Sequence, residues 1–565
     1  MMQTDRILAA LSLFVTVVAC AYADGFKQGP VVSSVDFSAY QKVYYVSPGV
    51  RAEGDGSREQ PWRSLTRALE SIDKASASSR CAVLVAAGTA VENTIRMKEY
   101  VDLFGGYDPT SWNRDPVRFQ TVLSGQKSGR ILIGVDHAVL DGFVVKGGRV
   151  RGKGAGILCD GSSPVIRNNL FVDNATLAPL GWAPKNLHEV ANDGGAIYAA
   201  NGAAPIIEHN LFVRNSTESG RGAAIAFHGR CHGRIAGNVF LENVSGKNDP
   251  MRSSDGAAVS IFDWSSPVIE NNLFIANQAL GKNDGGGLFI ALWSSPKVVG
   301  NVFVGNEATD DGGGLFFGGQ EHRYDRPLDP LPDAKSFCAV IDRNYFAGNT
   351  NQGGNSSALR FTMEGRGRFS NNVCVENQAL YFQRSEAEIV NNTIMHSFRI
   401  VETKQGLGPS KLINNIIWAP MVVEAPVVIS HCNLKEPREG EGNISRMPEF
   451  VKDGISLAVE STRCDDQQFS TYLRIRGGVP GRHLVGRAVE SQGKWSVVRS
   501  IDEHGLTVWG DFDGSRELRF PPTGHLAPGS PGVDLGSVVQ SVPHDMDGEM
   551  RPRGRATDIG ADEVR

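Results

Sequence analysis

A set of charged and aromatic residues near the middle of the chain offers the groups that β-elimination of a uronic-acid polysaccharide requires. Such a reaction needs a group that neutralises the sugar carboxylate, a base that removes the C5 proton and a donor that protonates the leaving oxygen. We assign Arg360 to the base or the carboxylate clamp, and His322 or Tyr324 to the proton transfer. Tyr381 follows Arg360 by one repeat and is the fourth candidate catalytic residue. No catalytic motif surrounds these residues, so solvated loop charges are the competing interpretation.

A glycoside hydrolase would instead place two facing carboxylates at the scissile bond. Asp325 and Glu364 are the nearest candidates for that pair. The residue types therefore leave a polysaccharide lyase and a glycoside hydrolase open, and they do not establish that the protein is an enzyme.

Aromatic residues recur at fixed positions after short glycine-rich segments. When these segments are aligned on the residue after their glycines, the outward positions include Tyr198, His228, Phe262, Trp264, Phe289, Trp293 and Phe316. We expect Trp264 and Trp293 to stack on adjacent coils. Exposed aromatic rings commonly hold the apolar faces of sugars, so these seven residues are the candidate substrate-binding face. The alternative is that covering loops bury them.

Aspartates immediately precede the glycine that opens several of the segments: Asp193, Asp255, Asp284 and Asp311. Carboxylates stacked one strand apart repel each other unless a cation, an arginine or backbone N–H groups compensate. Asp284, Asp310 and Asp311 are the candidate ligands for Ca²⁺, which prefers several oxygen ligands on loops. Ordinary Asp–Gly turns, which need no metal, are the alternative.

The elements that would position these residues form a repeat between about residues 140 and 420. Its signature is Asn-x-Phe-x-x-Asn, as at 169–174 and 210–215, and the first asparagines lie 20 to 43 residues apart. The shortest separations match one turn of a parallel β-helix, and the longer ones imply inserted loops. Turns would stack at about 4.8 Å, with phenylalanines inside and asparagines paired at the bends. The sequence therefore predicts an all-β fold, a single-stranded right-handed parallel β-helix.

The ends of such a solenoid must be covered, because an open strand edge invites association. Apolar residues at helical intervals in 61–74 predict an N-terminal helical cap. Residues 470–520 alternate in hairpin fashion and predict a small C-terminal antiparallel β module.

We divide the chain into a signal peptide (1–23), a β-helix with its N-terminal cap (40–455) and a C-terminal region (456–565). Arg6 followed by an apolar run is typical of a secretory signal. Ala21-Tyr22-Ala23 is a cleavage signal, whereas Val17-Val-Ala-Cys20 resembles a bacterial lipobox and would make Cys20 a lipid anchor. Both outcomes place the protein outside the cytoplasm, secreted or at the cell surface by bacterial-type export.

Gly194-Gly-Ala-Ile197 and Phe171-Val-Asp-Asn174 resemble the short repeats of polymorphic outer-membrane proteins. Val43–Pro48 with Pro61–Leu65 resembles the opening of secreted pectin-lyase-like β-helix proteins, and Asp558-Ile-Gly-Ala561 is similar to a C-terminal ending of such chains. The resemblance implies the β-helix fold. It leaves the activity open, because this architecture hosts lyases, hydrolases, epimerases, adhesins and non-catalytic surface proteins.

Composition narrows the choice of partners. The net charge of −5 over 565 residues gives no reason to expect nucleic acid. No long apolar run follows the first two dozen residues, so we expect no transmembrane span in the mature chain. We expect a monomer that binds, and in its enzymatic form cleaves, a polysaccharide or cell-surface glycan, with Ca²⁺ as the one candidate cofactor. The alternative is a non-catalytic cell-surface or adhesin-like structural protein.

Overall fold

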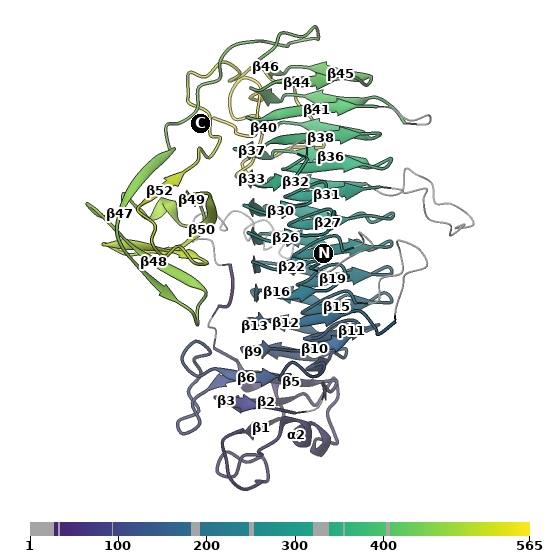
Figure 1. Ribbon diagram of the computed structural model, residues 1–565, viewed down its shortest axis with the longest axis vertical. Coiled ribbons are helices and arrows are strands. Elements are labelled where there is room, and N and C mark those ends of the chain that lie inside the picture. Colours follow the sequence, from purple (N-terminus) through teal and green to yellow (C-terminus); the bar gives the residue numbers. More distant parts are fainter. Residues whose placement is uncertain are drawn as a thin grey trace, which may run out of the picture.

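The repeat winds into a coil that passes through three sheets on each complete turn and, from β10 (Arg149–Arg151) to β34 (Thr350–Asn351), through a fourth (Figure 1). One turn runs through β12 (Val165–Arg167), β13 (Leu170–Val172), β14 (Ala175–Leu177) and β15 (Ile197–Ala200), and β16 (Ile206–Glu208) then pairs in parallel with β12. The predicted all-β, right-handed parallel β-helix is therefore confirmed. This computed structural model describes residues 28–31, 34–92, 94–181, 192–247, 254–319, 338–353, 356–402 and 407–564.

Stacked turns align the strands into four parallel sheets, numbered 1 to 4 in the order in which one turn visits them. Sheet 1 contains β1 (Lys42–Val46), β2 (Cys81–Ala86), β5 (Val101–Tyr107), β8 (Val139–Asp141), β12, β16, β20 (Arg234–Ala236), β24 (Val268–Glu270), β28 (Lys297–Val299), β32 (Ala339–Asp342), β36 (Arg366–Ser370), β39 (Glu386–Val390), β42 (Ser410–Ile413) and β45 (Val427–Ser430). Sheet 2 contains β3 (Gly88–Ala90), β6 (Thr121–Ser124), β9 (Phe143–Lys146), β13, β17 (Leu211–Val213), β21 (Val239–Leu241), β25 (Leu273–Ile275), β29 (Val302–Val304), β33 (Tyr345–Ala347), β37 (Val373–Val375), β40 (Thr393–Ile394), β43 (Ile416–Ile417) and β46 (Asn433–Leu434).

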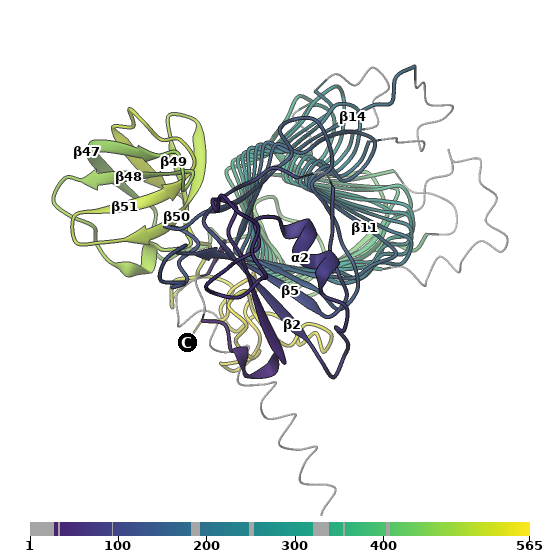
Figure 2. The same ribbon diagram turned by 90° about the horizontal axis from the view of Figure 1, so that it is seen from below.

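Sheets 3 and 4 complete the turn. Sheet 3 contains β10 (Arg149–Arg151), β14, β18 (Ser216–Thr217), β22 (Val244–Ser245), β26 (Gln278–Ala279), β30 (Glu307–Ala308) and β34 (Thr350–Asn351). Sheet 4 contains β4 (Ile95–Arg96), β7 (Leu132–Ile133), β11 (Ile157–Asp160), β15, β19 (Ile225–His228), β23 (Val259–Phe262), β27 (Leu288–Ile290), β31 (Leu315–Gly318), β35 (Leu359–Thr362), β38 (Ala379–Gln383), β41 (Ser397–Val401) and β44 (Met421–Val423). Viewed along the coil axis, the sheets enclose one interior (Figure 2).

The two asparagines of the repeat form two ladders, one at each end of the sheet 2 strands. In the first ladder, Asn169 Nδ2 donates to Asn210 Oδ1 at 3.1 Å, and the pattern continues coil by coil to Asn415. In the second, Asn174 Nδ2 donates to Asn215 Oδ1 at 3.0 Å, and the pattern continues coil by coil to Asn377. These hydrogen bonds satisfy buried amides that would otherwise carry a large desolvation cost.

The phenylalanine of the repeat lies inside the coil. The rings of Phe171, Phe212, Phe240, Phe274, Phe303 and Phe346 stack with centroids 4.5 to 5.1 Å apart. All six are fully buried, which places them in the central core. Spacing of aromatic rings by one strand separation explains why the same residue type recurs at this position.

The predicted N-terminal cap is helix α2 (Leu65–Ser71). Ser64 Oγ accepts a hydrogen bond from Arg67 N–H at 3.2 Å, as an N-cap residue does. Leu65 and Leu69 are buried against the first coil, and the ring of Trp62 stacks on Tyr44. The helix thus seals the lower end of the core.

The C-terminal module is a closed antiparallel barrel. It contains, in spatial order, β47 (Ile455–Asp465), β48 (Ser470–Ile475), β51 (Gly505–Trp509), β50 (Lys494–Ile501), β49 (Ala488–Ser491) and β52 (Glu517–Phe520). The predicted antiparallel module is confirmed, with one more strand at its start than the alternation in 470–520 indicated. The barrel stands beside the coil, as Figures 1 and 2 show.

The barrel covers the outer face of sheet 2. Each interior phenylalanine is preceded and followed in its strand by other residues, which are often apolar. Because side chains alternate along a strand, residues such as Leu273 and Ile275 point outward and must be shielded from water by another part of the chain. Val497 and Trp509 of the barrel belong to the same buried apolar cluster. Gly348 has a φ of 62°, and a Cβ atom there would overlap the Trp495 ring, so the glycine allows the barrel to approach closely.

The tail after the barrel packs on the upper coils. Gly560 N–H donates to the Asn414 carbonyl at 2.7 Å, and Ala561 N–H donates to Thr393 Oγ1 at 3.0 Å. Arg551 and Glu563 form a buried ion pair at 2.9 Å that holds the tail together. The segment that resembles the ending of other β-helix chains therefore serves here to attach the tail to the coil.

Candidate functional site

The outward residues of sheet 4 lie in the columns that the sequence alignment predicted. Paired strands place Tyr198, Ala226, Ser260, Phe289, Phe316, Arg360 and Tyr381 in one file. Trp264 and Trp293 stack as expected, with ring centroids 5.4 Å apart. The alignment is therefore confirmed, while the binding role of these residues stays a prediction.

The expected exposure of most aromatic residues in these columns is wrong. Tyr198, Phe262, Phe289, Trp293 and Phe316 are all buried, with exposed fractions of 1 to 7%. The physical reason is that rings one strand apart pack on one another, as Phe289 and Phe316 do at 5.1 Å. His228 and Trp264 remain partly exposed.

A polar cluster lies on the lower part of this face, around His228. The His228 ring is 3.8 Å from Asp193 Oδ2 through Nδ1 and 3.6 Å from Asp263 Oδ2 through Nε2. Lys153 Nζ donates to the Tyr198 hydroxyl at 3.0 Å. Although burial alone would raise the pKa of Asp193, the nearby His228, Lys153 and Arg221 together lower it. The Asp193 carboxylate is therefore held in its ionised form.

The aspartates that precede the coil-opening glycines accept hydrogen bonds from backbone N–H groups, which compensate their charge without a metal. Asp255 Oδ1 accepts from Asp284 N–H at 3.1 Å, and Asp284 Oδ1 accepts from Asp311 N–H at 2.9 Å. Each carboxylate thus bonds the backbone of the next coil. Oxygen atoms of Asp284, Asp310 and Asp311 nevertheless lie within 4.8 Å of one another, a spacing compatible with a cation. Calcium binding therefore stays a prediction.

Replacing Asp284 with asparagine should separate these two interpretations. Burial, and then the charges of Asp255 and Asp311, raise the pKa of Asp284 well above its ordinary value. A carboxyl with a raised folded-state pKa costs stability as the pH rises above its unfolded pKa of about 3.9. We expect Asp284→Asn, whose amide oxygen can keep the bond from Asp311 N–H, to have a higher thermal midpoint than the wild type at neutral pH in chelator.

Below about pH 4 the two midpoints should converge, because the wild-type carboxyl is then protonated in both states. Added Ca²⁺ should stabilise the wild type alone if the three aspartates bind it. Scanning calorimetry over a pH series, with chelator and with Ca²⁺, measures both effects. A lower midpoint for the variant in chelator would contradict the electrostatic argument.

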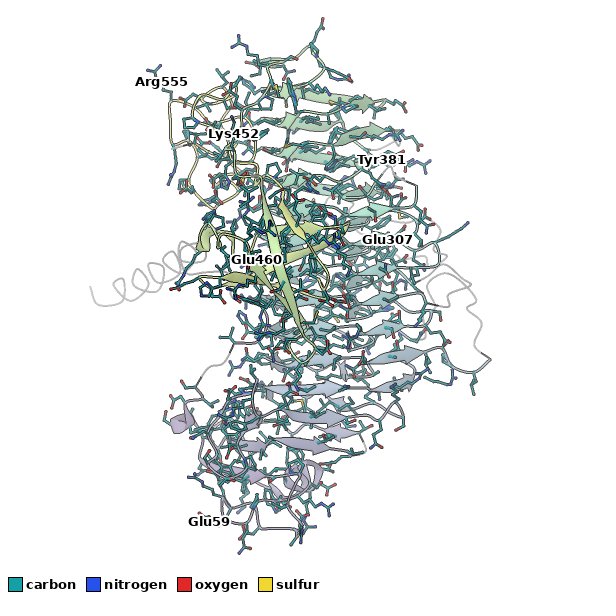
Figure 3. The ribbon with its side chains drawn as sticks, turned by 60° about the vertical axis from the view of Figure 1, so that its left-hand side comes forward. Glu59, Glu307, Tyr381, Lys452, Glu460 and Arg555 are labelled. Carbon is teal, nitrogen blue, oxygen red and sulfur yellow. The ribbon has the colours of Figure 1, made fainter. Side chains whose placement is uncertain are left out.

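A second polar cluster lies on the upper part of sheet 4. The guanidinium of Arg360 lies 3.9 Å from the centroid of the Tyr381 ring, and that of Arg399 lies 5.0 Å from the same centroid. Arg360 also approaches Asp311 Oδ2 at 3.4 Å and donates to Gln383. Tyr381 is partly exposed and lies on the outside of the stacked coils (Figure 3). The cluster offers positive charge beside an aromatic face.

The catalytic assignments are only partly testable by this geometry. Arg360 and Tyr381 come together as predicted, but His322, Tyr324 and Asp325 lie outside the described residues. Arg360, whose guanidinium is paired with the Asp311 carboxylate, suits a clamp better than a base. Glu364 lies on the turn after β35, with a φ of 58°. The lyase and hydrolase assignments both stay predictions.

Two residues of these clusters were not foreseen. Asp263 follows β23 directly, and Arg399 occupies the outward column one coil beyond Tyr381. Extending the column alignment by one more turn would have found Arg399. Asp263 carries no comparable signal, because its role depends on how the turn after β23 faces His228.

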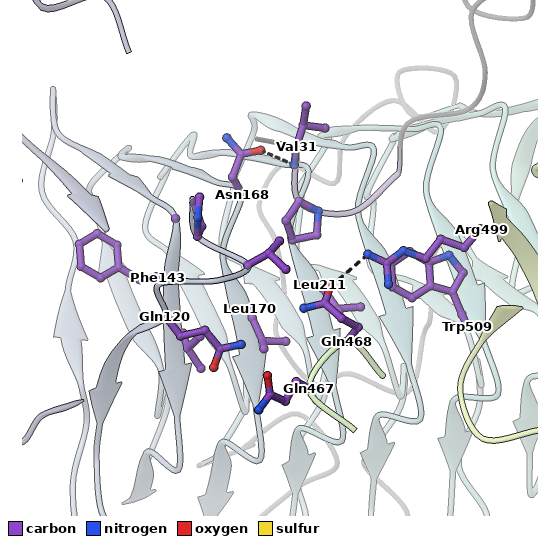
Figure 4. Close-up of a pocket in the computed structure, with 15 residues that line it drawn as sticks. Val31, Gln120, Phe143, Asn168, Leu170, Leu211, Gln467, Gln468, Arg499 and Trp509 are labelled. Carbon is purple, nitrogen blue, oxygen red and sulfur yellow. Dashed lines mark hydrogen bonds between the residues drawn. The ribbon is translucent and has the colours of Figure 1, made fainter. Parts of the chain in front are cut away.

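A pocket lies at the seam between the barrel and the coil (Figure 4). Leu170 and Leu211 of sheet 2 form part of its apolar wall. Val31 N–H donates to Asn168 Oδ1 at 3.1 Å, and Arg499 donates to Gln468 Oε1 at 3.1 Å. Much of its polar lining is therefore engaged in joining the N-terminal segment, the barrel and the coil.

Residues 120–322 match the family model described as "Right handed beta helix region". The match covers part of the coil and agrees with the right-handed parallel β-helix described above. No curated protein gives a significant match to the sequence. Among the described residues, no helix is long and apolar enough to cross a membrane.

Solved structures with related architecture share little sequence with this chain. The crystal structure of pectate lyase Pel9A is 12% identical, with 96% of this chain and 100% of that chain covered and a TM-score of 0.32. The complex of XylC with xylose is 9% identical, with coverage of 92% and 98% and a TM-score of 0.39. A double mutant of the tailspike protein of E. coli bacteriophage HK620 is 12% identical, with coverage of 85% and 94% and a TM-score of 0.29. At these values the likeness does not assign an activity.

Proposed function

We propose that this is an exported, monomeric protein that binds an extracellular polysaccharide along the outer face of sheet 4. The observation that carries the proposal is a pair of clusters on that face. His228 and Trp264 are the partly exposed residues of one, and Tyr381 and Arg399, with the buried Arg360 beside them, form the other. Aromatic faces next to charged hydrogen-bonding groups suit the mixed apolar and polar surface of sugars.

The separation of the two clusters favours a polymer over a small ligand. Trp264 follows β23, and Tyr381 lies four coils further on, in β38. At the spacing of parallel strands these coils span about 19 Å. A chain of sugars can contact both clusters at once, whereas a single sugar can contact one.

The arginines favour an acidic glycan, and the elimination of a uronic acid is the most specific enzymatic form of the proposal. Arg360 or Arg399 would neutralise the sugar carboxylate, as a guanidinium does well. Cleavage would also need a base and a proton donor, for which His322 and Tyr324 are our candidates. Ca²⁺ at Asp284, Asp310 and Asp311 would supply further charge compensation.

The burial of the aromatic residues in the outward columns of sheet 4 favours a second candidate function, that of a non-catalytic surface protein. Phe289 and Phe316 stabilise the coil by packing on each other, which requires no ligand. In that case the protein would present a rigid face to a protein receptor and show no affinity for glycans.

A panel of soluble polysaccharides tests the proposal, with binding measured by calorimetry. Cleavage is measured by ultraviolet absorbance of unsaturated uronates and by reducing ends. We expect Arg399→Ala and Trp264→Ala each to weaken binding about tenfold, equivalent to ~1.4 kcal/mol. Lys411→Ala is the matched control, because it removes a cation from the next strand along the chain, which lies in sheet 1, where Lys411 is 3.6 Å from Glu388. Failure of the wild type to bind any glycan in the panel would contradict the proposal.

A further inference from the structure

The segment after the barrel brings a histidine and two aspartates together, away from both clusters of sheet 4. His525 Nε2 lies 2.9 Å from Asp547 Oδ2. One ligand atom from each of His525, Asp547 and Asp562 lies within 4.8 Å of the other two. Asp562 is only 6% exposed, but the His525 and Asp547 side chains are 35% and 28% exposed, so solvent can reach the group.

The hydrogen bonds behind His525 fix which of its nitrogens carries a proton. The Thr523 hydroxyl donates its one hydrogen to the Asp453 carboxylate, which can only accept. Thr523 Oγ1 must then accept from His525 Nδ1, its other polar neighbour. Nδ1 is therefore protonated, and Nε2 faces the Asp547 carboxylate with either a second proton or a lone pair.

A lone pair facing a carboxylate oxygen at 2.9 Å is repulsive unless a second proton or a metal ion lies between them. The distance is that of a hydrogen bond, whereas two tetrahedral ligands, each about 2.1 Å from a metal ion, are about 3.4 Å apart, so a small outward movement of either side chain would admit the ion. Charge favours the metal. A protonated imidazole would balance one of the two aspartates, whereas a divalent cation balances both. The hydroxyl on Nδ1 is also the kind of outer contact that orients a metal-binding histidine.

We propose that His525, Asp547 and Asp562 bind one first-row divalent metal ion of the Zn²⁺ type, with water completing its coordination. One imidazole and two carboxylates suit such ions, whereas Ca²⁺ takes oxygen ligands. His525 follows the last barrel strand, and Asp562 directly follows Ala561, which is bonded to Thr393 of the coil. The ion therefore fastens the barrel exit to the tail that attaches to the coil. This site is independent of the proposed glycan binding.

Calorimetry of the chelator-treated, full-length mature protein with Zn²⁺ tests the site. We expect one equivalent to bind and to raise the thermal midpoint, and Ca²⁺ to do neither at this position. Asp547→Asn keeps an oxygen that can accept from the histidine, and His525→Gln removes the imidazole. Each should bind Zn²⁺ at least about tenfold more weakly. His483→Gln removes an exposed barrel histidine and should bind as the wild type does.

The thermal unfolding transitions of the variants, measured in the presence of chelator, show whether each variant is folded. If His525→Gln does not fold, Asp547→Asn decides the question alone. The proposal is overturned if the wild type binds no Zn²⁺, in which case His525 is a protonated partner of Asp547. It is equally overturned if the folded variants bind Zn²⁺ as tightly as the wild type.

Discussion

Replacing Asn272 with leucine should lower the free energy of unfolding by about 3–6 kcal/mol. Asn272 Nδ2 donates to the Ile235 carbonyl and to Asn301 Oδ1, both at 2.9 Å. Its Oδ1 accepts from Asn238 N–H at 2.9 Å and from Asn238 Nδ2 at 3.0 Å. Leucine has nearly the same shape but leaves these buried partners unpaired, each at a cost of roughly 1–3 kcal/mol before relaxation. Urea unfolding followed by circular dichroism measures the loss.

The neighbouring Asn271 provides a matched control. It lies on the exposed side of the same turn with a φ of 54°, a conformation that glycine adopts freely. Asn271→Gly should change stability by less than about 1 kcal/mol. If Asn272→Leu costs no more than this control, the ladder does not stabilise the coil in the way that its hydrogen bonds indicate.

Replacing Phe303 with alanine should cost about 3–5 kcal/mol. The Phe303 ring is fully buried and lies 4.5 Å from Phe274 and 4.8 Å from Phe346, nearly parallel to both. Its removal opens a cavity between two rings whose backbones are held by sheet hydrogen bonds, so the site has little freedom to collapse. The same denaturant titration measures the effect.

Phe303→Leu is the companion variant, because it keeps most of the apolar volume. It should cost about 1–2 kcal/mol, since volume-conserving changes are tolerated better than truncation. Equal losses for the two variants would show that the aromatic stack matters more than the filled volume. If Phe303→Ala lowers the free energy of unfolding by less than about 1 kcal/mol, the stacked phenylalanines are not central to the core.

The coil was predictable because the repeat keeps a constant interval between its two asparagines. The fixed interval from Asn169 to Asn174, repeated in later turns, requires both residues to occupy the same place in each coil, and the ladders confirm it. The columns of sheet 4 follow from the same alignment. Register therefore transfers directly from sequence to structure in this fold.

Exposure was less predictable than register. Phe289 is in the expected column, but its burial depends on neighbours from adjacent coils, which no single segment reveals. The barrel contact was readable in part, because Leu273 and Ile275 flank an inward Phe274 and must both face outward. The sequence does not show that the barrel covers these residues. That contact depends on the tertiary structure, in which Trp495 packs against Gly348 although the two are far apart in the sequence.

The crystal structure of the protein with a bound oligosaccharide, chosen from the polysaccharides that the panel identifies, tests the central proposal most directly. We predict electron density for the sugar chain along the outer face of sheet 4, with one end at Trp264 and the other at Tyr381 and Arg399. Density confined to another surface, such as the seam between the barrel and sheet 2, would contradict the proposal.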